Sequence, residues 1–255
     1  MVARVLREDL APVQIRVARN FMQSQFPQHI AVIPDGNRRW ARARGLYPGE
    51  GHREGAKRFH EVFAEAVKIG IPYFTFWAAS ESNLLERNRL EVKFLVKILK
   101  EALRNKSFRE ILKKNGTRVQ CIGRWNEILK DAALERVIQE LEAETGNYRK
   151  NRLTMLLGYD GRWEMIEAVN KLKAAGGKRK IDYDDLSGVL WTGDLPPVDL
   201  VIRTGGEPHW SAGFMMWLTA DSQFYFTEKF WPDFGKNEFK KALADYTGRE
   251  RRLGC

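Results

Sequence analysis

The amino-acid sequence predicts an α/β fold: a single domain with a mainly parallel central sheet flanked by helices. Two observations lead to this prediction. Short apolar runs, typical of buried strands, alternate along the chain with longer segments whose apolar residues recur at helical spacing. Several of these runs end in polar, turn-forming residues, as strands of a parallel sheet do where they enter a loop before a helix. The length of 255 residues is enough for one large domain with a sizeable core, or for two small ones.

The composition is that of a globular protein with a basic surface. Hydrophobic residues make up 44% of the chain, and 43 Lys and Arg against 33 Asp and Glu give a formal charge of +10. That excess is compatible with nucleic acid, an anionic membrane face or phosphorylated small molecules as partners. The two cysteines, Cys121 and Cys255, form neither a disulfide framework nor a metal-ligand spacing, which favours a reducing, cytoplasmic location. No apolar run reaches the roughly 18 residues of a transmembrane helix, and no signal peptide is recognisable.

The chain begins with residues 1–28, in which arginines and apolar residues are mixed. A basic amphipathic helix on a membrane surface is one interpretation of this segment. Pro12 interrupts the pattern, so a loosely attached N-terminal extension is the preferred interpretation. The domain proper then covers residues 29–255.

The first half of that domain predicts two strands and two helices in alternation. Residues 30–33 are a purely apolar run, and residues 73–79 are a dense run of aromatic and apolar side chains. Between them, residues 53–69 carry apolar residues at helical spacing and end at Gly70, as a helix capped by glycine would. Residues 88–104 have the pattern of a second amphipathic helix.

The second half continues the alternation and ends in a segment rich in aromatic residues, followed by a helix. Its predicted strands are 117–123, 153–157 and 198–202, and its predicted helices are 126–144 and 163–174. Five aromatic side chains are expected in the core: Trp77, Phe224, Tyr225, Phe226 and Trp231.

The loop after the first strand carries the most distinctive chemistry of the chain. Asp35, Gly36, Asn37, Arg38 and Arg39 follow one another directly. Glycine lets backbone N–H groups approach a ligand, and the arginines supply planar donors that suit phosphate oxygens. An acid among such groups is explained if a hard cation such as Mg²⁺ lies between it and the phosphate. A tight turn with a capping Asp and solvated arginines is the alternative, but a loop at the end of a buried strand favours a ligand site.

Two further strand ends carry polar groups, and in a parallel sheet all three ends lie at one edge. Arg203 comes directly after a predicted strand and before two glycines, which favours a phosphate clamp. Asn83 follows another strand and is equally compatible with a turn former and with an acceptor near a reacting centre. His52 begins a predicted helix, where it could bind an anion and move a proton or simply bond to backbone. Neither a dinucleotide-binding glycine loop nor a P-loop is present.

Several motifs resemble those of the cis-prenyltransferases, the undecaprenyl diphosphate synthase family. The resemblance runs in order from about residue 29 to residue 254, and its motifs are 31–41, 51–55, 198–207, 224–227, 231–234 and 249–254. It implies a homodimer with a parallel sheet, flanking helices and an apolar tunnel. It also implies Mg²⁺-dependent condensation of isopentenyl diphosphate with an allylic diphosphate, and a peripheral membrane contact for product release.

The resemblance also assigns roles to individual residues. Asp35 would hold Mg²⁺, Asn83 would be near the proton that is lost, and His52 would assist; these three are the expected catalytic residues. The expected substrate-binding residues are Gly36, Asn37, Arg38, Arg39, Trp40, His52, Ser80, Arg87, Arg203, His209, Ser211, Arg252 and Gly254. The terminal Arg252 and Gly254 match an Arg-x-Gly motif that reaches the neighbouring subunit in the family.

The chain departs from the family pattern at several of these places. Pro48 and His209 stand where arginine is common, and Gln223 replaces a glutamate that assists Mg²⁺, with Asp221 two residues before it. In the segment 80–84 the acid is displaced by one position and a tryptophan is missing. Arg87 follows an extra residue, and 212–213 holds two residues in place of one.

Three functions are compared on this basis. An active cis-prenyltransferase is favoured because the aspartate loop and the terminal motif are both present. A weakly active or non-catalytic prenyl-diphosphate-binding subunit of a heteromeric prenyltransferase is the alternative. A nucleic-acid binder is disfavoured because no motif of a known nucleic-acid module is present. The product is expected to be medium or long, because Ala78 and Ala79 are small, although large side chains could close the tunnel: Phe59, Phe63, Phe94 and Phe108.

Overall fold

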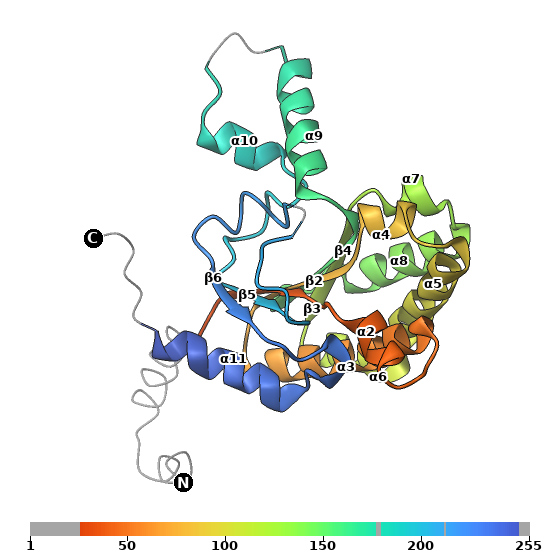
Figure 1. Ribbon diagram of the computed structural model, residues 1–255. Helices are drawn as coiled ribbons and strands as arrows, with labels where there is room; N and C mark the ends of the chain where they lie inside the picture. The colour runs from red at the N-terminus through yellow and green to blue at the C-terminus, as the bar shows by residue number, and fades with distance from the viewer. Residues whose placement is uncertain (1–25, 177–179, 212, 250–255) are drawn as a thin grey trace.

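The computed structural model describes residues 26–176, 180–211 and 213–249 and contains one six-stranded sheet (Figure 1). Every pair of neighbouring strands is parallel, and the strand order is β3-β4-β2-β1-β5-β6. The strands are β1 (His29–Ile33), β2 (Tyr73–Ser80), β3 (Thr117–Ile122), β4 (Asn151–Tyr159), β5 (Leu200–Arg203) and β6 (Gln223–Phe226). The predicted α/β fold with a parallel sheet flanked by helices is confirmed.

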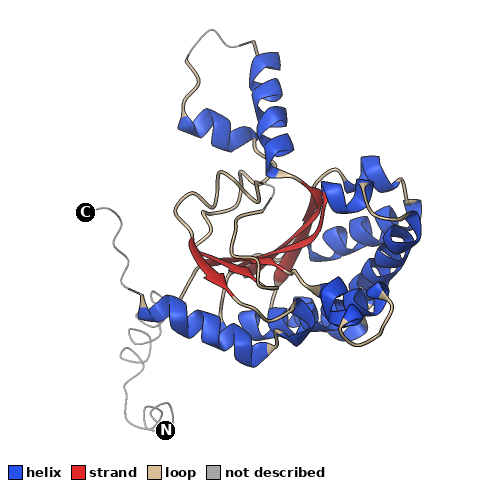
Figure 2. Ribbon diagram, in the orientation of Figure 1, coloured by secondary structure: helices blue, strands red, loops and turns tan. Residues whose placement is uncertain are grey.

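Helices connect the strands and gather mainly on one face of the sheet (Figure 2). In chain order they are α2 (Asn37–Arg42), α3 (Pro48–Ile69), α4 (Glu81–Leu85), α5 (Arg89–Arg104), α6 (Lys106–Lys114), α7 (Trp125–Leu129), α8 (Ala132–Thr145), α9 (Gly161–Ala174), α10 (Tyr183–Val189), the short 3-10 helix η2 (Trp231–Asp233) and α11 (Lys236–Gly248). The pair α9 and α10 extends beyond the sheet in Figure 1.

Strand β1 illustrates how the two faces are covered, because its side chains alternate between them. Ile30 and Val32 pack on the face covered by α3, α5, α8 and α11. Ala31 and Ile33 point to the other face, where Phe214 lies in an irregular segment rather than in a helix. A strand with both faces buried has no polar positions, which explains the continuous apolar run in the sequence.

Two local predictions differ from the structure, and several short elements were not predicted. The predicted helix 126–144 is divided into α7 and α8, because Lys130 has a φ of 47° and Asp131 caps α8 by accepting from the N–H of Leu134. Helix α3 begins at Pro48, where proline is well tolerated in a first turn, so His52 lies one turn inside the helix. Helices α2, α4, α6 and α10 and strand β6 were not predicted.

Strand β6 is the edge strand of the sheet, which corrects the expectation that its aromatic residues lie in the core. Phe226 is 40% exposed, and Phe224 and Tyr225 are only partly buried. Trp77 and Trp231 are buried as expected. The predicted extension 1–28 lies outside the described residues, apart from its last three.

Candidate active site

The carboxyl ends of β1, β2 and β5 surround a polar cavity of about 390 Å³. It is lined by Ile33, Pro34, Asp35, Gly36, Asn37, Arg38, Arg39, Arg42, His52, Trp77, Ala78, Ser80, Ser82, Asn83, Arg87, Arg203 and Ser211. The three strand ends predicted to share one edge therefore do so. Parallel pairing places Ile33 opposite Arg203, and this register brings the first and the last of the polar loops together.

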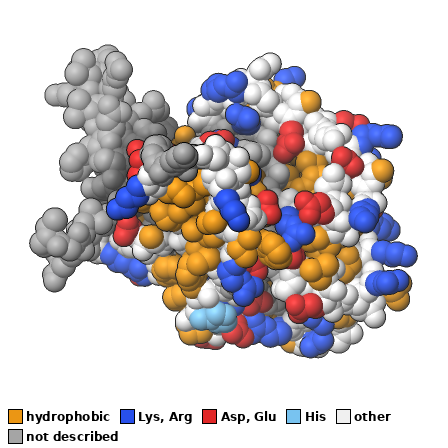
Figure 3. Space-filling model, turned by 90° about the horizontal axis from the view of Figure 1, so that it is seen from above, with side chains coloured by type: hydrophobic (Ala, Val, Ile, Leu, Met, Phe, Trp, Pro, Cys, Tyr) orange, Lys and Arg blue, Asp and Glu red, His pale blue; other side chains and the backbone are white. Residues whose placement is uncertain are grey.

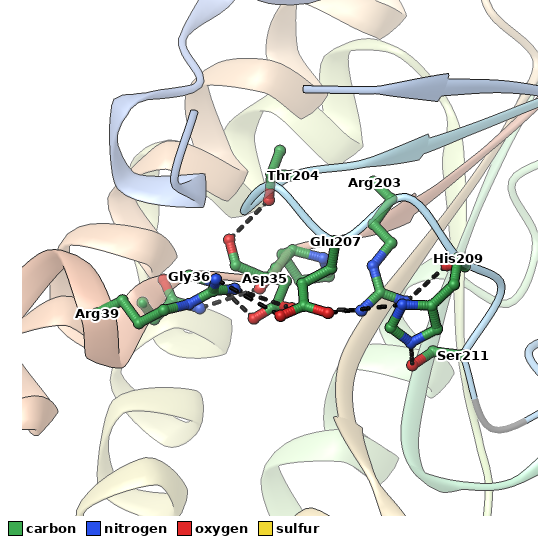
Figure 4. Close-up of polar contacts among 10 residues, drawn as sticks. Asp35, Gly36, Arg39, Arg203, Thr204, Glu207, His209 and Ser211 are labelled. Atoms are coloured by element: carbon green, nitrogen blue, oxygen red, sulfur yellow. Dashed lines mark hydrogen bonds and ion pairs between the residues drawn. The ribbon is translucent and has the colours of Figure 1, made fainter. Parts of the chain in front are cut away.

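Asp35 is the only acidic residue that lines this cavity in the described part of the chain, and its polar contacts are drawn in Figure 4. Its Oδ2 lies 3.2 Å from a guanidinium nitrogen of Arg39 and 3.4 Å from one of Arg203. Its Oδ1 accepts from the N–H of Gly36 at 2.6 Å. The alternative that Asp35 caps the next helix is wrong, because the N-cap of α2 is Gly36, which has no side chain to accept from the first turn.

Glycine is required at two places beside Asp35. Gly36 has a φ of 102°, and a Cβ there would lie 2.6 Å from the ring of Phe230. Gly205 has a φ of 94°, and a Cβ there would lie 2.8 Å from the guanidinium of Arg39. Both positions combine a left-handed backbone with close approach, so a larger residue would displace the charged groups of the loop.

Arg203 is a buried cation at the base of the cavity, with a side chain only 5% exposed. It donates to the backbone carbonyl of His209 at 2.8 Å as well as to Asp35. Burial lowers the pKa of its guanidinium, and the carboxylate of Asp35 opposes that shift. Its Nε has no hydrogen-bond partner among the residues that the structure describes. A buried arginine with an unpaired donor at a strand end is well suited to bind an anion.

A second charged cluster lies on the opposite side of the cavity. Arg38, His52 and Arg87 all approach the carboxylate of Glu91, in the first turn of α5. Burial lowers the pKa of His52 to about 4, and the charge of Arg87 adds to the shift while Glu91 opposes it. His52 is therefore neutral at pH 7. Nε2 of the imidazole lies 3.3 Å from a donor nitrogen of Arg87 and 3.5 Å from the acceptor Oε1 of Glu91, so the tautomer of His52 decides which of the two it bonds.

Helix α4 brings three polar residues to the cavity: Ser80, Ser82 and Asn83. The Oγ of Ser80 accepts from the backbone N–H of Asn83 at 3.0 Å and so caps the helix. The displaced acid Glu81 points elsewhere, since it is buried and lies 3.4 Å from Arg124. Ser82 thus takes the place at the cavity that an acid would hold in the family pattern.

Several expected residues do not line the cavity. The indole of Trp40 donates to Asp233 at 2.7 Å and stacks against Arg44. His209 lies at the rim, where its ring nitrogens are 3.5 Å from Glu207 and 3.5 Å from Ser211. Gln223 begins β6 and pairs with Leu200 of β5. The cavity residue Arg203 pairs with Phe226 at the other end of these two strands. Pro48 begins α3, and Arg252, Gly254 and Ala212 lie outside the described residues.

Sequence reasoning missed other residues that the structure brings to the site. Arg42 and Ser82 line the cavity, and Thr204 donates to the backbone carbonyl of Asp35 at 2.8 Å. Glu207 lies 3.7 Å from Arg39 beside Asp35 (Figure 4), and Glu91 joins the second cluster. Ser82, Thr204 and Glu207 lie within the segments 80–84 and 198–207 that the sequence singles out, and Glu91 follows Arg87 by four residues, the spacing of an ion pair on a helix.

An apolar cavity of about 60 Å³ continues from the polar one. The two share Pro34, Asn37, His52 and Ala78, and the apolar cavity runs between α3 and α5 above β2. Of the four phenylalanines considered as stoppers, Phe59 alone lines it. The hydrocarbon path expected between these helices thus has a counterpart in the structure.

The donor set around Asp35 is compatible with Mg²⁺. The described residues contain no group of three or more His, Cys, Asp or Glu side chains that could hold a metal ion alone. Mg²⁺ commonly uses one or two carboxylates, several waters and the phosphates of a substrate. A single carboxylate at the mouth of an arginine-lined cavity fits a cation that is shared with a diphosphate.

Comparisons with known proteins agree on the type of protein. The family model of undecaprenyl diphosphate synthases matches residues 33–254. An isoprenyl transferase of Fusobacterium nucleatum is 40% identical over 233 residues, which are 91% of this chain and 98% of that protein. A tritrans,polycis-undecaprenyl-diphosphate synthase (geranylgeranyl-diphosphate specific) of Sulfurisphaera tokodaii is 35% identical over 235 residues, 90% of this chain and 88% of that protein. The crystal structure of lavandulyl diphosphate synthase from Lavandula x intermedia with dimethylallyl diphosphate has a TM-score of 0.85 and 31% identity, and it covers 91% of this chain and 100% of that one.

Proposed function

The chain belongs to the undecaprenyl diphosphate synthase family of cis-prenyltransferases, and on that premise we propose that it condenses isopentenyl diphosphate with an allylic diphosphate in an Mg²⁺-dependent reaction. The observation that carries the proposal is the junction of the two cavities at His52 and Ala78. A prenyl diphosphate has a charged head and an apolar tail. The junction offers each part of such a molecule a matching surface.

The charges of the polar cavity support binding of two diphosphates. Five arginines line it, namely Arg38, Arg39, Arg42, Arg87 and Arg203, against the single acid Asp35. Arginine binds phosphate oxygens through parallel N–H donors, and such charge-assisted hydrogen bonds are about twice as strong as neutral ones. We assign the allylic diphosphate to the loop of Asn37, Arg38 and Arg39, and isopentenyl diphosphate to Arg203 and Ser211.

In the proposed mechanism the protein residues orient both substrates and stabilise charge. When bound, Mg²⁺ supplies positive charge beside Asp35 and helps the allylic diphosphate to leave. As the allylic carbon–oxygen bond breaks, the double bond of isopentenyl diphosphate attacks the allylic carbon, and the new carbon–carbon bond forms. The carbocation formed in this way then loses a proton from the former isopentenyl unit near Asn83, the electrons of that carbon–hydrogen bond form the new double bond, and the released diphosphate takes up the proton. Neutral His52 stays beside the cavity and adds no positive charge at pH 7.

We further propose that the protein is a homodimer joined through helix α9. Trp163, Ile166 and Val169 on α9 and Tyr183 on α10 are exposed. Figure 3 looks down on the end of the molecule where these helices lie, and hydrophobic side chains gather on that face. A second copy would remove them from water, which is the usual fate of a large apolar patch.

The product, with its apolar tail, favours a peripheral membrane contact during release. Within the described part of the chain, no helix has the length and apolar character needed to cross a membrane. The proposed contact is therefore one at the membrane surface.

The test is incubation of the purified protein with labelled isopentenyl diphosphate, Mg²⁺ and a panel of allylic diphosphates, followed by sizing of the products. Incorporation that stops when EDTA is added supports the proposal. Binding of a prenyl diphosphate without incorporation would contradict it and favour the alternative, a non-catalytic subunit of a heteromeric prenyltransferase.

A further inference from the structure

Glu91 places one buried carboxylate behind the polar cavity. Its side chain is 10% exposed, and its atom Oε1 has three neighbours. They are a terminal nitrogen of Arg87 at 3.3 Å, Nε of Arg38 at 3.4 Å and Nε2 of His52 at 3.5 Å. Glu91 itself does not line the cavity, whereas these three neighbours do.

The three neighbours come from separate parts of the fold. Arg38 lies on α2, His52 on α3, and Arg87 on the turn between α4 and α5. Oε1 of Glu91, on α5, therefore contacts one residue from each of these three segments. The contacts of Arg38 and Arg87 leave the remaining N–H groups of each guanidinium free for an anion.

A carboxylate at this place carries two energetic costs. Removing a charged group from water is unfavourable, and well-packed apolar residues often stabilise a fold more than a buried ion pair does. A negative charge beside an anion site also repels the anion. A role in fixing the geometry of the surrounding groups would offset both costs.

We propose that Glu91 is a positioning residue of the diphosphate site, which holds Arg38, Arg87 and His52 in the orientation that binds the head of the substrate. The inference rests on the proposed function, since it concerns the same cavity. It assigns Glu91 no contact with the substrate. The carboxylate acts through its three neighbours.

Two possible roles of Glu91 predict opposite changes in the affinity for inorganic diphosphate when Glu91 is replaced, and the test measures that affinity. If Glu91 only adds negative charge, then Glu91→Gln and Glu91→Ala tighten binding. If Glu91 positions the arginines, both variants weaken binding, and Glu91→Ala weakens it more because Gln keeps an acceptor oxygen at the same place. Titration calorimetry at matched pH and ionic strength measures the difference.

We expect Glu91→Ala to weaken diphosphate binding and to lower kcat/KM for the allylic substrate by about 10- to 100-fold, the range found for groups that orient ligands at metal sites. Glu91→Gln should recover part of this loss. The matched control is Glu101→Gln, a change of the same kind on the exposed end of α5, which should alter neither quantity. Melting curves identify any variant that fails to fold.

Tighter or unchanged diphosphate binding in both variants would overturn the inference, and so would equal losses in Glu91→Gln and in Glu91→Ala. Binding of inorganic diphosphate needs no turnover. A wild-type protein that binds diphosphate but incorporates no isopentenyl diphosphate would therefore contradict the proposed function and leave this test valid.

Discussion

The carboxylate of Asp35 pairs with the guanidinium of Arg203 at 3.4 Å, although the two residues are 168 positions apart in the chain. Their strands, β1 and β5, are neighbours in the sheet, and Ile33 at the end of β1 pairs with Arg203 at the end of β5. Asp35 follows Ile33 by two residues and therefore lies close to Arg203. The pair joins the loop assigned to the allylic substrate with the arginine assigned to isopentenyl diphosphate. It also gives the buried charge of Arg203 a partner.

We predict that Asp35→Asn abolishes turnover without loss of the fold. The amide keeps an acceptor for Arg203 but removes the anionic metal ligand, and metal ions contribute several kcal/mol to such reactions, so the rate should fall at least about a hundredfold. Steady-state kinetics and a melting curve measure the two effects. Near-normal turnover in a folded variant would exclude Asp35 as the essential ligand.

We predict that Glu207→Gln raises the Mg²⁺ concentration needed for half-maximal activity. Glu207 contacts Arg39, which also contacts Asp35, so its carboxylate adds negative charge close to the proposed metal ligand (Figure 4). Gln223→Glu is the matched control, because Gln223 lies at the other end of strand β6. A lower Mg²⁺ requirement in Gln223→Glu would show that this side chain reaches a metal site after all.

Acid should destabilise the fold through three histidines. Burial lowers the pKa of His29, His52 and His60 to about 4. An unfolded histidine, with a pKa near 6.5, binds a proton more readily than these do, so stability falls as the pH drops from about 6.5 to 4. From pH 7.5 to pH 5 each histidine contributes a loss of about 2 kcal/mol.

The variant His60→Phe isolates one of the three contributions. His60 stacks on Phe108 with ring centroids 4.6 Å apart, and its Nε2 has no hydrogen-bond partner in the described part of the chain, so a phenyl ring preserves the stacking contact. Urea unfolding at pH 7.5 and pH 5 should show a smaller loss of stability in the variant than in the wild type. Equal losses in both proteins would mean that His60 does not titrate as its burial requires.

The length of the product should depend on Ala78. This residue lies where the polar and apolar cavities meet, so Ala78→Leu narrows the path of the hydrocarbon and should shorten the product distribution. Phe59→Leu, deeper in the apolar cavity, should lengthen it. Phe63→Leu is the control, because Phe63 is buried but lines neither cavity. Mass analysis with identical lengths for wild type and Ala78→Leu would place the growing chain elsewhere.

A charge on the apolar face of α9 should separate the proposed dimer. Val169 is 53% exposed and points to the same face as Ile166. Val169→Glu is expected to give a monomer by sedimentation or light scattering, since a buried unpaired carboxylate opposes association. Asn237→Glu, at an exposed position on α11 and away from α9 and α10 (Figure 1), should leave the assembly unchanged. A monomeric wild type would contradict the proposed assembly directly.

The sequence was informative where the signal for a structural element and the signal for a functional loop lie next to each other in the chain. The apolar run 30–33 followed by Asp35 and Gly36 predicted both a buried strand and a ligand loop, because each signal lies within a few residues. Strand β6 was missed because it is only four residues long and lies inside a longer segment rich in aromatic residues, so no separate apolar run marks it. The break at Lys130 was missed because a left-handed backbone at a lysine has no sequence signature.

The assembly of the charged clusters could not be predicted from spacing. Glu91 meets Arg87 four residues away, but its contacts with Arg38 and His52 depend on how α2, α3 and α5 pack. The displacement of Glu81 was visible in the sequence, whereas its pairing with Arg124 follows from the position of α7. Expected roles for Trp40 and Gln223 came from the resemblance and find no support in the placement of these side chains within the chain described.

The apolar cavity is narrow, about 60 Å³, and its walls are the core residues of α3 and α5 themselves. A longer hydrocarbon fits inside it only if these helices separate. The hydrophobic core that stabilises the fold therefore also has to accommodate the product. Each lengthening step then trades contacts between protein side chains for contacts with the growing chain. The free-energy cost of separating α3 and α5 would oppose each further addition. This cost would therefore set the length at which the product leaves the protein.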